Sequence, residues 1–184
     1  DLINENNLSY SSPLEVGAQT WTEEGRLQNL VGSYNPSIWS GIPEILQVMP
    51  DSFGNLTELL TLFLNAHQLT VLPHSFSQLT KLFTLEIHDN LLITIPNLDN
   101  LGNLYSLDLG YNKLTFIPES ICELDALQYL YLFHNQLSYL PDCMCDMDIE
   151  WSGIDPGDMP NFASGGNHLC ANVPDCIEES DNFE

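Results

Sequence analysis

The sequence predicts an α/β solenoid, in which short parallel strands stack along one axis and each strand is followed by a return segment. Each of four stretches has Leu or Ile at positions 1, 4, 6 and 11. They begin 23, 22 and 23 residues apart: LLTLFLNAHQL from Leu59, LFTLEIHDNLL from Leu82, LYSLDLGYNKL from Leu104 and LQYLYLFHNQL from Leu127. A fixed period of this size is typical of stacked repeats, because one unit cannot bury its own apolar side.

The first part of each unit has the alternation of a β-strand. In the unit that begins at Leu59, Leu62 and Leu64 would point to one side, while Thr61, Phe63 and Asn65 would point to the other. Units stacked about 4.8 Å apart would join these strands into a parallel sheet with an aliphatic inner face.

The second part of each unit predicts an extended or 3-10 return segment. A Leu-Pro or Ile-Pro pair recurs at the same offset, and proline stops a long helix. The pairs are Leu72-Pro73, Ile95-Pro96, Ile117-Pro118 and Leu140-Pro141, preceded by Met49-Pro50. Asn90, Asn112 and Asn135 occupy position 9, where stacked amides can form a ladder that bonds buried backbone groups. His67 stands at this position in the first unit, and we expect it to break the ladder there.

The pattern LxxLxLxxNxLxxLPxxFxxLxx over residues 27–151 resembles the leucine-rich-repeat family. This resemblance implies a right-handed superhelix with a concave parallel sheet and a convex side of extended and 3-10 segments. Trp21 and Glu24-Gly25-Arg26-Leu27 are similar to the lead-in of extracellular plant and bacterial members. Leu169-Cys170 and Pro174-Asp175-Cys176 are similar to the cysteine-bearing close of secreted bacterial members.

Three regions follow from the repeats. Residues 1–26 are predicted to cap the first turn with Leu14, Val16 and Trp21, because a solenoid must cover its open ends. Residues 27–151 hold about five to six units, and an insertion lies near 37–45, since Leu27 is 32 residues before Leu59. Residues 152–184 are predicted to form a cysteine-containing cap at the other end.

The five cysteines predict an oxidising compartment. Four of them lie in the last 42 residues, a pattern typical of a disulfide staple in a secreted or cell-surface protein. The favoured bridge is Cys170–Cys176. Cys122 and Cys145 lie 23 residues apart on stacked turns, so both are expected to be buried thiols unless Cys145 joins the cap. One cysteine would stay unpaired or pair between chains. The spacing disfavours zinc.

The charge balance excludes some partners. Three Lys+Arg against 26 Asp+Glu give a formal net charge of −23, which opposes nucleic acid and anionic lipid. No apolar run reaches the length of about 20 residues that a membrane span needs.

The outward strand positions carry the candidate binding residues. Inward positions must be aliphatic, but nothing about the fold requires aromatic side chains outside, and aromatic anchors beside charges are typical of recognition surfaces. These aromatics could also only stabilise the sheet as cross-strand neighbours. The candidates are Phe63, Glu86, His88, Asp108, Tyr111, Tyr129, Tyr131, Phe133 and His134. The sequence thus favours an extracellular module that binds a protein, peptide or glycan. The alternative is a subunit that assembles with copies of itself into a filament or surface layer.

The motifs of common enzymes are missing from the sequence, which predicts no catalytic residues and no cofactor. GxSxG, HExxH and a glycine-rich phosphate loop are all absent. Alternating Asp146, Asp148 and Glu150 leave calcium as a weak alternative, without the glycine and spaced glutamate of a calcium loop. Asn7 and Asn55 begin N-glycosylation sequons.

Overall fold

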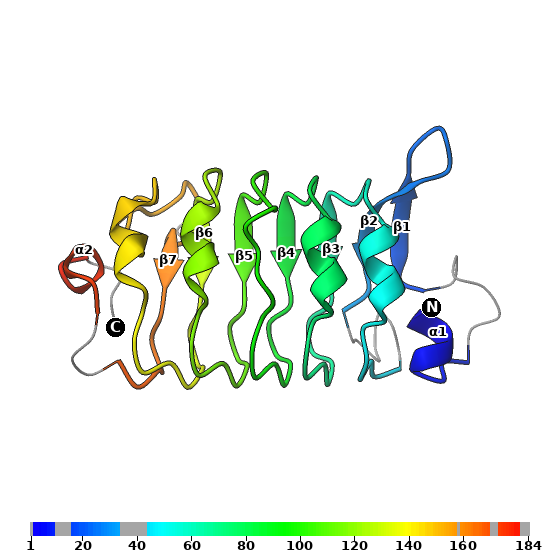
Figure 1. Ribbon diagram of the computed structural model, residues 1–184, viewed down its shortest axis with the longest axis horizontal. Coiled ribbons are helices and arrows are strands. Elements are labelled where there is room, and N and C mark those ends of the chain that lie inside the picture. Colours follow the sequence, from blue (N-terminus) through cyan, green and yellow to red (C-terminus); the bar gives the residue numbers. More distant parts are fainter. Residues whose placement is uncertain (1, 10–15, 34–43, 158, 170–172, 181–184) are drawn as a thin grey trace.

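The computed structural model describes residues 2–9, 16–33, 44–157, 159–169 and 173–180 and confirms the predicted solenoid. Over these residues one sheet runs the length of an elongated body, its seven strands in sequence order (Figure 1). The strands are β1 (Ala18–Trp21), β2 (Leu27–Val31), β3 (Thr61–Phe63), β4 (Thr84–Glu86), β5 (Ser106–Asp108), β6 (Tyr129–Tyr131) and β7 (Phe162–Ala163). The β1 strand is antiparallel to β2, and every later pair is parallel.

Short helices form the return side of the turns. Four 3-10 helices follow prolines in extended conformation, as the Leu-Pro pattern predicts: η2 (Asp51–Asn55), η3 (His74–Gln78), η4 (Glu119–Glu123) and η5 (Asp142–Asp146). Two short α-helices, α1 (Leu2–Glu5) and α2 (Asp175–Glu178), lie near the two ends of the body (Figure 1). Each return segment covers the inner face of the sheet and completes its turn.

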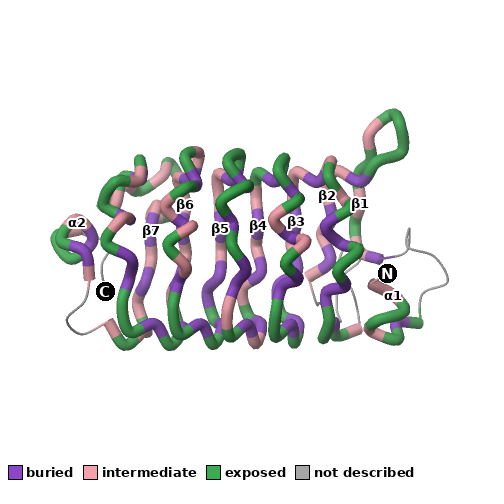
Figure 2. Tube along the Cα trace, in the orientation of Figure 1, coloured by how far each residue is buried: buried purple, intermediate pink, exposed green. Residues whose placement is uncertain are grey.

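The core is a column of aliphatic side chains inside the turns. Leu62, Leu85, Leu107 and Leu130 are paired in register from strand to strand, and each is at most 1% exposed. Buried segments recur at matching places of successive turns in Figure 2. The inward register predicted from the repeat is therefore confirmed, and the other face of each strand is left to solvent.

Buried asparagines connect the turns as predicted. Asn90 donates through Nδ2 to the Leu64 carbonyl at 2.8 Å and accepts from the Leu69 N–H at 3.0 Å. Asn112 and Asn135 make the same bonds to the preceding turn.

The expected break at His67 is wrong. His67 is 5% exposed, its Nδ1 accepts from the Leu46 N–H at 3.1 Å, and its Nε2 lies 2.7 Å from the Gly32 carbonyl. These are the backbone groups that an asparagine serves in later turns. An imidazole can serve them because it offers one acceptor and one donor nitrogen when neutral.

The ladder also continues past residue 151, where the sequence pattern placed the end of the repeats. Leu130 pairs with Phe162 in β7, and Phe162 is fully buried. Asn167 accepts from the Leu137 N–H at 3.0 Å and donates to the Leu132 carbonyl at 2.8 Å. Residues 159–169 thus form one more turn whose leucine positions are mostly replaced by other residues.

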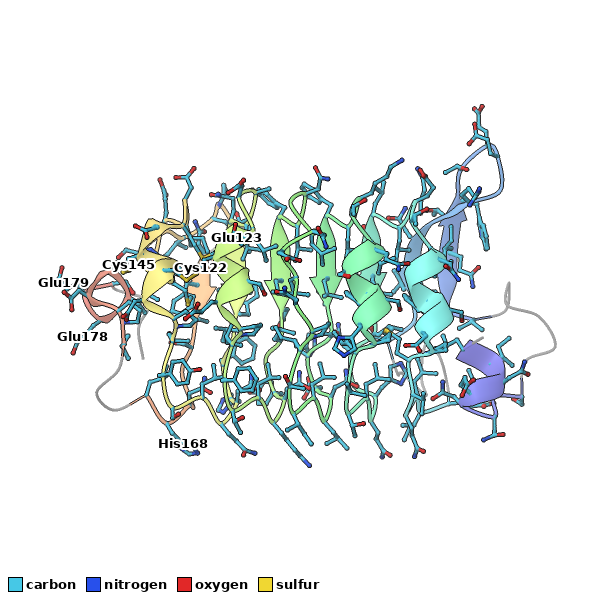
Figure 3. All side chains as sticks on the ribbon, viewed as in Figure 1. Cys122, Glu123, Cys145, His168, Glu178 and Glu179 are labelled. Atoms are coloured by element: carbon cyan, nitrogen blue, oxygen red, sulfur yellow. A yellow bond between two sulfur atoms is a disulfide. The ribbon has the colours of Figure 1, made fainter. Side chains whose placement is uncertain are left out.

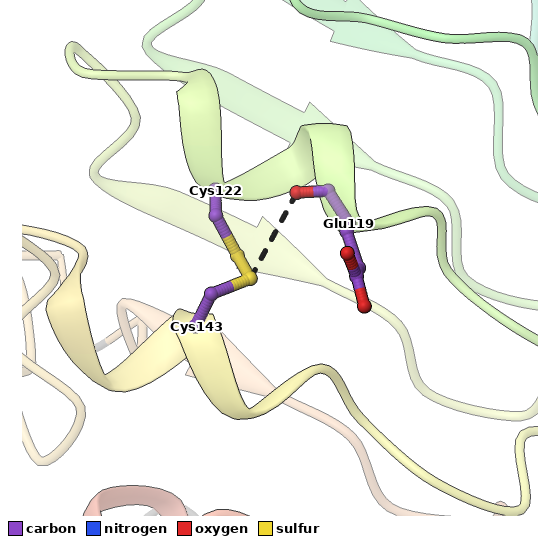
Figure 4. The surroundings of a disulfide bond; sticks show 3 residues. All are labelled: Glu119, Cys122 and Cys143. Atoms are coloured by element: carbon purple, nitrogen blue, oxygen red, sulfur yellow. Dashed lines mark hydrogen bonds between the residues drawn. A yellow bond between two sulfur atoms is a disulfide. The ribbon is translucent and has the colours of Figure 1, made fainter.

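The predicted Cys170–Cys176 bridge is wrong, because Cys176 is bonded to Cys145. A second disulfide joins Cys122 of η4 to Cys143 of η5, whose Cα atoms lie 6.0 Å apart on adjacent turns (Figure 4). Cys122 is therefore not a buried thiol, whereas the alternative that Cys145 joins the cap is confirmed. Cys145 lies beside α2, which carries Glu178 (Figure 3). Cys170 lies outside the described residues.

Two other predicted segments are only partly described. Val16 of the N-terminal cap is buried and Trp21 is 41% exposed, whereas Leu14 lies outside the described residues. Most of the insertion near 37–45 also lies outside them.

Candidate interaction surface

The exposed side of the sheet, predicted to be concave, carries the candidate binding residues. In β3 to β6 each central leucine is buried and its two neighbours are half-buried. Tyr129 and Tyr131 therefore lie on the solvent side, while Leu130 and Leu132 are fully buried. We call this side the concave face.

Four rings meet at the ends of β5 and β6 in what we call the aromatic cluster: Tyr111, Tyr131, Phe133 and His134. Tyr111 stacks on His134 with ring centroids 4.5 Å apart and meets Phe133 edge-on at 5.3 Å. Phe133 lies 6.3 Å from Tyr131. Edge and stacked pairs of this kind stabilise each other, so the cluster is preorganised.

Glycines make room for two of these rings. A Cβ placed on Gly110 would lie 2.6 Å from the Phe133 ring, and one placed on Gly166 would lie 2.5 Å from the His134 ring. Both rings thus rest directly on the backbone of a neighbouring turn. A larger residue at either glycine would displace the ring that rests on it.

The cluster depends on a repeated left-handed corner. Ala66, Asp89, Tyr111 and His134 have φ between 49° and 61° at the same position of successive turns, one residue before the ladder side chain. Such backbone is unfavourable for residues other than glycine. The buried ladder bonds immediately after each corner maintain this conformation.

A second aromatic row lies at the other end of the strands. Phe83 and Tyr105 are parallel within 5° at 4.9 Å, and Tyr105 lies 5.4 Å from Tyr129. Phe83 and Tyr105 do not follow from the sequence pattern, because the predicted strand alternation begins at position 3. Both stand at position 2. Backbone hydrogen bonds between neighbouring turns already begin at this position, since the Phe83 N–H donates to the Leu60 carbonyl.

Carboxylates lie beside the aromatic cluster. Glu86 pairs in register with Asp108, and His88 Nδ1 lies 2.8 Å from an oxygen of Asp89. The Gly110 N–H donates to Asp108 at 2.9 Å.

The surroundings of Asp108 and Tyr131 raise the pKa of both side chains. Burial raises the pKa of the Asp108 carboxyl. The Gly110 hydrogen bond and His88 oppose that shift, and the charges of Glu86 and Asp89 add to it. Burial, followed by the charge of Asp155, raises the pKa of the Tyr131 hydroxyl to about 12. Tyr131 therefore keeps its proton at neutral pH and can donate a hydrogen bond to a partner.

The remaining candidates lie apart. Phe63 lies on β3, which β4 and β5 separate from β6, and it pairs in register with Glu86. Over the described residues no three His, Cys, Asp or Glu side chains gather as a metal site, so Asp146, Asp148 and Glu150 do not converge on one ion. Asn7 and Asn55 are both exposed, and Asn55 ends η2 on the return side.

Known proteins share this architecture. Residues 97–137 match the family described as leucine rich repeat. A leucine-rich-repeat protein of Leptospira interrogans is 29% identical with a TM-score of 0.60, over 85% of this chain and 42% of that protein, so this chain spans less than half of its length. The ectodomain of the receptor kinase SOBIR1 from Arabidopsis thaliana is 20% identical with a TM-score of 0.68, over 94% and 90% of the two chains.

A TDR receptor structure is 24% identical with a TM-score of 0.58, over 77% of this chain and 22% of that one. The likeness to this receptor and to the SOBIR1 ectodomain concerns the fold alone. No curated protein has a sequence that matches the chain. None of the helices in the described ranges is long and apolar enough to cross a membrane.

Proposed function

This chain is a leucine-rich-repeat protein, and we propose that it is an extracellular module that binds a partner protein or peptide on its concave face. Leucine-rich-repeat modules generally mediate protein interactions, and the family is non-catalytic. The observation that carries the proposal is the aromatic cluster beside Glu86 and Asp108. Large rings on a rigid sheet offer contact area at little cost in conformational entropy, and adjacent charges add specificity.

Two observations support an extracellular location. The described residues contain two disulfides, Cys122–Cys143 and Cys145–Cys176, and such bonds persist in oxidising compartments. Its fold is similar to that of a receptor ectodomain. The exposed sequon at Asn55 is compatible with a glycan on the return side, which would leave the concave face accessible.

The test is a paired substitution in the cluster. Partners would be selected from a displayed library of extracellular proteins and peptides with the intact protein. Tyr131→Ala with Phe133→Ala should abolish their binding, whereas Phe116→Ala with Tyr139→Ala, which removes two exposed rings outside the sheet, should not. Unchanged binding by the first variant, with a native circular dichroism spectrum, would exclude the concave face.

One observation favours self-assembly as a second candidate function. Exposed apolar side chains recur once per turn after the buried position 11 and are 38–56% exposed: Val48, Val71, Ile93, Phe116 and Tyr139. Val48, Val71, Phe116 and Tyr139 stand at position 13 of their turns and Ile93 stands at position 12. Five successive turns therefore carry an exposed apolar side chain, which we call the stripe, on the same stretch of the return side, and such a row is unusual on so acidic a protein. Sedimentation velocity of the intact protein and of Ile93→Ser with Phe116→Ser tests this candidate, since polymers that persist in the variant would rule the stripe out.

A further inference from the structure

A pocket of about 450 Å³ opens at the beginning of β2, β3 and β4, away from the aromatic cluster. It is lined by Asn29, Leu60, Thr61, Lys81, Phe83 and Asn103. Its volume falls within the range of small-molecule sites. Thr61 lies on the concave face, but none of the lining residues belongs to the aromatic cluster that carries the partner proposal, so the pocket has no role in that proposal.

The pocket lies where the second aromatic row stops. Position 2 of successive turns holds Leu60, Phe83 and Tyr105, and the Phe83 ring lies parallel to Tyr105 on one side. Because β3, β4 and β5 follow each other in the sheet, the other side of the Phe83 ring faces the preceding turn. Position 2 of that turn is Leu60, which is not aromatic. Phe83 is 49% exposed. The pocket is thus a vacant place for one flat ring that would continue the stack.

Polar groups surround this place. The amide nitrogens of Asn29 and Asn103 donate to Thr20 and to the Thr80 carbonyl, which fixes both amides and leaves their oxygens to accept from a ligand. Lys81 pairs with Glu58 at 2.6 Å on the rim, where the pair offers both a donor and an acceptor. The rim therefore carries acceptors, one ammonium group and the Thr61 hydroxyl around an apolar floor.

We propose that this pocket binds one neutral pyranose ring, stacked on the free face of Phe83. A pyranose has an apolar C–H face and hydroxyl groups along its edge, which matches the aromatic wall and polar rim. An aromatic side chain of a partner would also fill the space, but its apolar edge would make no hydrogen bond to either amide oxygen, whereas the hydroxyl groups of a sugar would donate to both. The ligand class is therefore a neutral glycan.

The test uses the intact protein with hexasaccharides of glucose, N-acetylglucosamine, mannose and xylose. Saturation-transfer NMR and calorimetry should detect binding of at least one of them. Phe83→Ala removes the platform, and Leu60→Phe places a ring of the protein's own in the vacant space. Each should lower the affinity about tenfold or more, as expected for the loss of one stacked ring contact. Ile154→Ala, which removes an exposed apolar side chain that belongs to none of the proposed sites, should bind as the unchanged protein does.

Three results would overturn the proposal. The first is that none of the four hexasaccharides binds saturably. The second is that Phe83→Ala and Leu60→Phe bind sugar with the affinity of the unchanged protein. The third is that the pocket binds N-acetyltyrosine amide and not sugar. Thermal unfolding of each variant verifies that the fold is intact. The variant with Tyr131→Ala and Phe133→Ala should keep sugar binding, so failure of the glycan site and failure of the partner site are separate results.

Discussion

The backbone N–H of Leu46 donates to Nδ1 of His67, a buried histidine where later turns have asparagine. The other ring nitrogen of His67 lies 2.7 Å from the Gly32 carbonyl. Nδ1 can accept a hydrogen bond only while the ring is neutral. Burial lowers the pKa of His67, and the Gly32 bond opposes this shift.

This geometry predicts a loss of stability in acid. Because folding lowers the pKa, the unfolded chain binds more protons than the folded chain between the two values. The His67 contribution to the free energy of unfolding is therefore complete above about pH 6.5 and decreases as the pH falls toward the folded pKa. Urea unfolding between about pH 5 and pH 7.5 measures the slope. The dependence of the free energy of unfolding on pH should be weaker in His67→Asn. His74→Asn, which replaces an exposed histidine, should leave it unchanged.

The ladder also shows how far the sequence could predict the fold. Apolar periodicity was sufficient for strands β2 to β6 and the register of Leu130, and the recurring Leu-Pro and Ile-Pro pairs were sufficient for the return segments. Apolar periodicity did not predict that His67 continues the ladder. The repeat pattern specifies asparagine at this position, whereas the ladder needs only one hydrogen-bond donor and one acceptor near the backbone groups. Asn167 was missed for a related reason, since its turn has Phe162 and Ser164 where earlier turns have leucine or isoleucine.

Disulfide connectivity and the second aromatic row needed coordinates. Cys143 reaches Cys122 because η4 and η5 stack on adjacent turns. The spacing of the cysteines placed Cys122 on a turn next to both Cys143 and Cys145, but which of the two it bonds depends on the directions of the side chains. Phe83 and Tyr105 had a usable signal, the same position in consecutive units, but their parallel stacking depends on ring orientation.

Leu107→Ala should destabilise the protein by about 3 kcal/mol, because truncation leaves a cavity among close-packed neighbours. Leu107 is fully buried in β5 and pairs in register with Leu85 and Leu130. Urea unfolding measures the change. Ser106→Ala, on the exposed side of the same strand, is the matched control and should change stability far less. Equal effects of the two substitutions would contradict the inward register.

Gly110→Ala should move the Phe133 ring without disrupting the core. The new Cβ would lie 2.6 Å from two ring atoms, so the ring must rotate or lift from the sheet. We expect a loss of about 1 kcal/mol, within the range of mild overpacking. Near-UV circular dichroism and NMR ring-current shifts of Tyr111 should change. Gly102→Ala, whose Cβ would meet nothing within 4 Å, should leave both unchanged.

The two disulfides should differ in what they stabilise. They join residues 21 and 31 positions apart, and chain-entropy arguments give about 3–4 kcal/mol for loops of these lengths. Cys122–Cys143 lies between η4 and η5 within the stacked turns, so replacing both cysteines with serine should lower the stability of the whole repeat array. Cys145–Cys176 ties α2 to η5, and Ile177 of α2 is fully buried. Replacing this pair should release α2 while the array stays folded.

Limited proteolysis with hydrogen exchange separates these effects. Without Cys145–Cys176, cleavage and fast exchange should appear in residues 173–180 while the amides of β3 to β6 stay protected, because their hydrogen bonds lie between turns. Without Cys122–Cys143, protection should fall across β5 and β6 as well, since a turn-to-turn contact is lost inside the array. Uniform loss of protection in both variants would show that the C-terminal cap and the repeats unfold as one unit. The cap would then be required for the repeats to fold, rather than being attached to a stable array.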